Sequence, residues 1–140
     1  MKKLNWLRLF LGGVTAGVVL ITLSTATSSL FRGSKVGGTL QPFHPFSNGT
    51  GAALFSIFAF LFVGMLLTWC YALIRPRFGP GPKTAAIAAL TVWLMLVAEM
   101  VRSVAVSAAI PDLPAGPMLP MLYLAMIIIS TEVGALVYTE

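Results

Sequence analysis

The sequence predicts an all-α integral membrane protein, and its composition and the spacing of its apolar residues carry that prediction. Hydrophobic residues make up 58% of the 140-residue chain and charged residues only 9%, with a mean hydropathy of +0.94. A soluble globular protein has about 25% charged residues, so this chain cannot cover its surface against water. Its apolar residues form four segments, each long enough for the roughly 20 residues that a helix needs to cross a bilayer.

These segments define one transmembrane domain over residues 1–140. The expected helices cover residues 7–30, 51–74, 83–109 and 118–138. The proline- and glycine-rich run between the second and third helices predicts a non-helical turn from Arg75 to Pro82, because each proline removes a backbone donor and restricts the residue before it. The connections between the expected helices are too short to cross the length of a bundle, so an up-down four-helix bundle is the expected packing.

The basic residues set the expected orientation. With the N-terminus inside, the cytoplasmic segments hold Lys2, Lys3, Arg8, Arg75, Arg77 and Lys83, whereas the outer segments hold Arg32 and Lys35. This bias follows the positive-inside rule and places both termini on the cytoplasmic side of the membrane. The net charge of +5 therefore suits membrane lipids and not nucleic acid. We expect Arg75, Arg77 and Lys83 to contact anionic headgroups.

The first segment carries a GxxxG spacing at Gly13 and Gly17. Small residues at this spacing allow a neighbouring helix backbone to approach closely. We therefore expect the two glycines to form a helix-packing site.

Glu99 and Arg102 interrupt the otherwise apolar stretch VWLMLVAEMVRSVAVSAA, residues 92–109. Residues three apart share a helix face, so the two side chains are expected to form an intramembrane ion pair. At about 1.5 Å per residue, Glu99 lies roughly 22 Å from the cytoplasmic end of its helix, and Arg102 is close enough to the outer surface to extend towards it. The preferred interpretation is a packing ion pair that orients the helix. A substrate or proton site and a contact to a partner subunit are the alternatives.

Glu132 is a second intramembrane acid, in the run IIISTEVGALVY. It lies in the cytoplasmic half of its helix, too far in depth from Glu99 and Arg102 to pair with either. Its expected partner is Arg8, Arg75, a neighbouring hydroxyl or a proton. An acid at this depth is also a candidate for a proton path.

His44 is the only histidine, between prolines in an expected loop. A single histidine can be an axial ligand for haem or a chlorophyll-type pigment, which makes His44 a weak ligand candidate. An interfacial loop anchored by phenylalanines is the preferred interpretation, and we predict no metal and no cofactor. The sequence holds no nucleophile–base pair or carboxylate dyad, so we expect no enzymatic activity.

The run YALIRPRFGPGPKTA, residues 71–85, resembles the central loop of a family of small, uncharacterised bacterial four-helix inner-membrane proteins. A Leu-Gly-Gly-x-x-Ala-Gly start, matched by residues 11–17, and a late glutamate, matched by Glu132, also recur in that family. Its members often carry an acid in the first helix, where this chain has only hydroxyl side chains. The resemblance implies the four-helix topology and the inner-membrane setting, and no reaction.

The leading hypothesis is a non-catalytic accessory or structural subunit that packs against a larger bacterial membrane complex. Its partner would be another membrane protein or a second copy of the chain. The alternative is a small oligomeric transporter, or a component of a proton or ion channel, that uses Glu99, Arg102 and Glu132. A third hypothesis is a membrane-bound cofactor or quinone site near Trp93 and His44.

Overall fold

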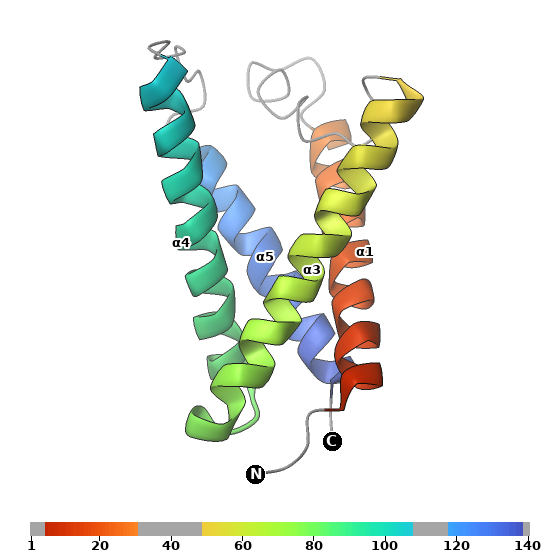
Figure 1. Cartoon of the computed structure of the whole chain (residues 1–140), viewed down its shortest axis with the longest axis vertical. Coiled ribbons are helices and arrows are strands. Elements are labelled where there is room, and N and C mark those ends of the chain that lie inside the picture. Colours follow the sequence, from red (N-terminus) through yellow and green to blue (C-terminus); the bar gives the residue numbers. More distant parts are fainter. Residues whose placement is uncertain (1–4, 31–48, 108–117, 139–140) are drawn as a thin grey trace.

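The computed structural model describes residues 5–30, 49–107 and 118–138. These residues form four helices and no strand: α1 (Trp6–Leu30), α3 (Thr50–Phe78), α4 (Pro82–Ser107) and α5 (Met118–Val137). The all-α class is therefore confirmed. Figure 1 shows α1 and α4 on opposite sides of α5, with α3 crossing the view diagonally from the α1 side to the α4 side.

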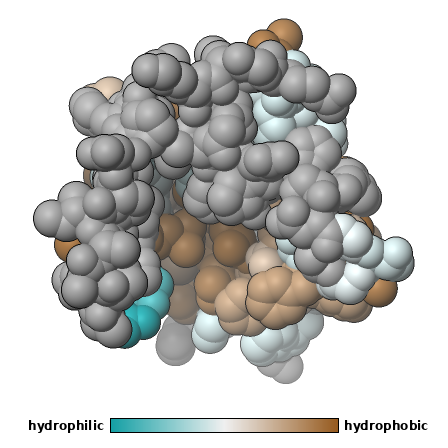
Figure 2. Space-filling model, turned by 90° about the horizontal axis from the view of Figure 1, so that it is seen from above, coloured by the Kyte–Doolittle hydropathy of each residue, from teal (hydrophilic) through white to brown (hydrophobic). Residues whose placement is uncertain are grey.

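Every helix in the described ranges is long and apolar enough to cross a membrane. The candidate spans are Trp6–Leu30, Ala53–Phe78, Pro82–Glu99 and Pro120–Val137. Seen from above in Figure 2, most of the coloured surface near the centre of the molecule is hydrophobic, and a strongly hydrophilic patch is visible at one edge. By length and composition, this is a multi-pass membrane protein.

The prediction of a non-helical turn from Arg75 onwards is wrong over its first half. α3 continues through Pro76 to Phe78. A proline in the last turn removes only its own backbone bond to the carbonyl four residues back, and the next turn still closes, since the Gly79 N–H donates to the Arg75 carbonyl at 2.8 Å. Gly79 then ends the helix at φ 79°, a backbone conformation that glycine adopts without strain.

The other helix ends lie close to their predicted positions. α1 begins after Asn5, whose side-chain oxygen accepts a hydrogen bond from the Arg8 backbone N–H at 3.3 Å, as an N-terminal cap does. α4 begins at Pro82, where a missing N–H costs nothing because that group has no partner inside the helix.

Glycines bring α1 and α3 into backbone contact. A Cβ atom built on Gly13 would lie 2.8 Å from the Met65 Cα, and one built on Gly17 would lie 2.8 Å from the Leu61 Cα. Because the higher-numbered residue of α1 meets the lower-numbered residue of α3, these two helices run antiparallel. The GxxxG spacing thus packs a helix of the same chain.

A second glycine contact joins α1 to α5. A Cβ atom on Gly12 would lie 2.9 Å from the Gly134 carbonyl oxygen and 3.0 Å from the Thr68 methyl group of α3. α4 packs on the other side of the molecule, against α3 and α5. The core between them is apolar, and its largest fully buried hydrophobic side chains are Leu20, Leu67 and Ile127.

Candidate functional site

Glu99 and Arg102 form the ion pair that their spacing predicts. The Arg102 Nε donates to Glu99 Oε2 at 2.8 Å, and the Arg102 Nη2 contacts Glu99 Oε1, so the contact is bidentate. The side chains are 64% and 61% exposed, for Arg102 and Glu99 respectively. The pair therefore lies on the outward face of α4 and not inside the bundle.

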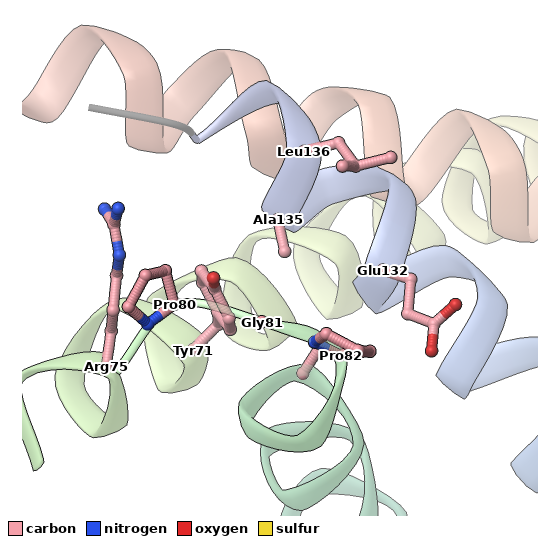
Figure 3. Close-up of a pocket in the computed structure, with 9 residues that line it drawn as sticks. Tyr71, Arg75, Pro80, Gly81, Pro82, Glu132, Ala135 and Leu136 are labelled. Carbon is pink, nitrogen blue, oxygen red and sulfur yellow. The ribbon is translucent and has the colours of Figure 1, made fainter. Parts of the chain in front are cut away.

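A cavity of about 450 Å³ lies where α3, the α3–α4 turn, the start of α4 and the last turns of α5 meet. Most of its wall is apolar. It is lined by Tyr71, Arg75, Pro80, Gly81, Pro82, Ala85, Glu132, Ala135 and Leu136. Figure 3 shows Arg75 and Glu132 at opposite ends of this group, with Tyr71 and the two prolines between them. Residues from three helices thus place one cation and one anion around a common space.

Two aromatic contacts hold the cationic end of the cavity. The Arg75 guanidinium carbon lies 5.7 Å from the centroid of the Tyr138 ring, within the range of a cation–π contact. Tyr138 in turn meets the Tyr71 ring edge-on, with centroids 6.3 Å apart and an interplanar angle of 89°. These contacts set Tyr71 and Arg75 side by side along the end of α3.

Tyr71 is the cavity residue that the sequence analysis missed as a site residue. It is only 4% exposed, yet no hydrogen bond to its hydroxyl is present among the described residues. Its neighbour Arg75 was predicted only to contact anionic headgroups. The only signal in the sequence was an aromatic with a polar tip near a helix end, where such residues are common.

Glu132 lines the cavity as an exposed side chain of α5. Two of its expected partners are engaged elsewhere, because the Ser130 hydroxyl donates to the Met126 carbonyl at 2.8 Å and the Thr131 hydroxyl to the Ile127 carbonyl at 2.7 Å. Within the described part of the chain, Glu132 makes no hydrogen bond or ion pair. Arg75 shares its cavity but contacts the Tyr138 ring.

The other residues expected to contact headgroups lie beside this cavity. Arg77 and Lys83 are exposed and flank the α3–α4 turn. The Thr84 hydroxyl closes the turn by donating to the Gly79 carbonyl at 2.7 Å. The basic residues of the turn and the cavity therefore belong to the same end of the molecule.

The described residues show no arrangement that supports the cofactor hypotheses. His44 lies outside the described residues, and within those residues no group of three His, Cys, Asp or Glu side chains is placed to hold a metal ion. The Trp93 indole Nε1 donates to the Pro120 carbonyl at 2.9 Å. Trp93 thus ties α4 to α5.

No protein-family model, curated protein or solved structure matches this chain.

Proposed function

We propose that this chain is a non-catalytic accessory subunit of a bacterial inner membrane that packs against a larger membrane complex. The observation that carries the proposal is the outward position of the Glu99–Arg102 pair on α4. Ionised side chains in membrane helices ordinarily face a bundle interior or a water-filled cavity. A bidentate pair on the outer face of an edge helix marks the surface that a neighbouring subunit covers.

In this proposal the helices form an up-down bundle with both termini in the cytoplasm. The antiparallel contact between α1 and α3 supports the alternating direction. The excess of lysine and arginine in the expected cytoplasmic segments supports the orientation. The outward pair then lies near the periplasmic end of α4, and the Arg75 cavity near the cytoplasmic surface.

The bundle interior favours an accessory role over transport. Glycine contacts close the space between α1 and its neighbours. The buried polar side chains of the described residues are all hydroxyls: Ser24, Ser28, Thr68, Thr84, Ser130 and Thr131. An ion path needs charged or water-accessible groups along its length. The alternative, a transporter that uses Glu99, Arg102 and Glu132, would require further copies of the chain to enclose these outward side chains.

Native purification tests the proposal. The full chain, tagged at its C-terminus and expressed at its normal level, is extracted from membranes in a mild detergent and sized with its bound proteins. We expect a stoichiometric membrane-protein partner that is lost from the double variant Glu99→Gln, Arg102→Gln. Recovery of the wild-type chain only as a monodisperse homo-oligomer would contradict the accessory role and favour the transporter.

A further inference from the structure

The cavity at the end of α3 has the size and the walls of a ligand site. Its volume of about 450 Å³ falls within the range of roughly 300–1,000 Å³ typical of small-molecule pockets. Prolines, alanines and a leucine form most of its wall, and Leu136 is among the exposed apolar side chains of α5. The cavity is therefore open to an amphiphile whose apolar part stays in the membrane.

The three polar side chains of the cavity lie close to the ends of their helices. Arg75 is three residues from the end of α3 and Glu132 five residues from the end of α5, or about 4–5 Å and 7–8 Å along each helix. Tyr71 lies about 10 Å from the end of α3. The ends of a helix that spans a bilayer lie where polar headgroups meet the hydrocarbon.

The charges of the cavity complement a zwitterion. Arg75 and Tyr71 carry hydrogen-bond donors at one end of the cavity, and Glu132 carries a carboxylate, a hydrogen-bond acceptor, at the other end (Figure 3). The Tyr71 residue is only 4% exposed, but its hydroxyl is not among the buried polar atoms that lack a partner. The hydroxyl makes no hydrogen bond in the described ranges and is therefore open to a ligand in the cavity that Tyr71 lines. A ligand with an anionic acceptor and a cationic donor would satisfy Tyr71 and Glu132 together.

We propose that this cavity binds the headgroup of an aminophospholipid, the phosphatidylethanolamine class. The lipid phosphate accepts hydrogen bonds from Tyr71 and Arg75, its primary ammonium donates to Glu132, and its acyl chains leave past Leu136. A purely anionic headgroup would bring its charge towards Glu132 without offering an ammonium. A choline headgroup carries no N–H to donate to the carboxylate. The site therefore selects for the primary amine, which the basic turn alone would not do.

Native mass spectrometry of the full chain tests this site. The chain is released from nanodiscs that contain equal amounts of phosphatidylethanolamine, phosphatidylcholine and phosphatidylglycerol with matched acyl chains. We expect retained adducts of the ethanolamine lipid to predominate. Glu132→Gln should reduce its retention over the choline lipid about tenfold, the value of one charge-assisted hydrogen bond.

Two further variants keep the test specific. Tyr71→Phe preserves the ring contact with Tyr138 and should weaken retention of both phosphatidylethanolamine and phosphatidylglycerol. The double variant Glu99→Gln, Arg102→Gln removes a carboxylate outside the cavity together with its partner cation and should change no lipid ratio. Equal retention of the three lipids by the wild-type chain, or a preference for phosphatidylglycerol that Glu132→Gln leaves unchanged, would overturn the proposal. Thermal unfolding of each variant in the same detergent verifies that it is folded.

Discussion

Gly64 of α3 lies so close to Gly17 of α1 that a Cβ atom on Gly64 would stand 2.7 Å from the Gly17 Cα. The added Cβ atom would meet backbone atoms, which cannot move away by a change of rotamer as a flexible side chain can. In lipid, helices associate through close packing and not through the hydrophobic effect. This contact therefore sets the distance between α1 and α3.

Gly64→Ala should destabilise the bundle by about 2 kcal/mol, because the added methyl group forces the two backbones apart. Gly51→Ala is the matched control in the same helix, where an added Cβ meets nothing within 4 Å. It should be neutral or stabilising by up to about 1 kcal/mol, since alanine is the better helix former. Reversible unfolding in mixed detergent micelles measures both. Equal stability of the two variants would show that α1 and α3 do not pack through Gly64.

Thr68→Val should raise the stability by about 1 kcal/mol. Among the described residues, the Thr68 Oγ1 is the buried side-chain polar atom that lacks a hydrogen-bond partner, so replacing it by a methyl group removes a desolvation penalty. Thr131→Val is the comparison, because the Thr131 hydroxyl is equally buried but donates to Ile127. That variant should not gain stability. The same unfolding titration distinguishes the two, and a loss of stability in Thr68→Val would mean that its hydroxyl is satisfied in the membrane.

Trp93→Phe should destabilise the packing of α4 on α5 by about 1 kcal/mol. The substitution keeps an aromatic ring but removes the indole N–H that donates to the Pro120 carbonyl, and a net hydrogen bond contributes about that much. Trp69→Phe is the control, because Trp69 is 47% exposed and no hydrogen bond of its indole is present in the described part of the chain. Unfolding followed by far-UV circular dichroism compares the two. A greater loss in Trp69→Phe would contradict this assignment.

Glu99→Gln should leave the unfolding midpoint of the isolated chain nearly unchanged, because an exposed ion pair contributes little to stability. The same variant should release the partner subunit, since it leaves Arg102 uncompensated at the contact. The charge-reversed pair Glu99→Arg with Arg102→Glu should restore part of the association. Association that survives both Glu99→Gln and Arg102→Gln would exclude this face as the contact.

The features that depend on local spacing could be predicted from the sequence. The four spans follow from apolar length, and the Glu99–Arg102 contact follows from a separation of three residues on one helix. The extent of α3 could not, because the effect of Pro76 depends on whether the following turn closes, which Gly79 decides. The contact of Gly17 with Gly64 could not be predicted either, since Gly64 is distant in sequence and does not belong to a recognisable packing motif.

Individual residues of the cavity could be predicted from the sequence, but the cavity itself could not. Arg75 and Glu132 stood out as charges in an apolar chain, but nothing in their spacing showed that they line one space. Tyr71 joins them only because α3 and α5 meet at the Tyr138 ring. Contacts between helices distant in sequence determine this site, and a single sequence does not encode them as a pattern.

Site-specific photo-cross-linking in intact membranes tests the accessory role most directly. A photoreactive residue replaces Met95, an outward side chain one turn from Glu99 that is 69% exposed, and the control replaces Val18 on the outer face of α1, 51% exposed. We expect one discrete adduct with a different membrane protein from position 95, absent from position 18 and lost in the Glu99→Gln background. Adducts with lipid alone, or with a second copy of the chain alone, would contradict the accessory role.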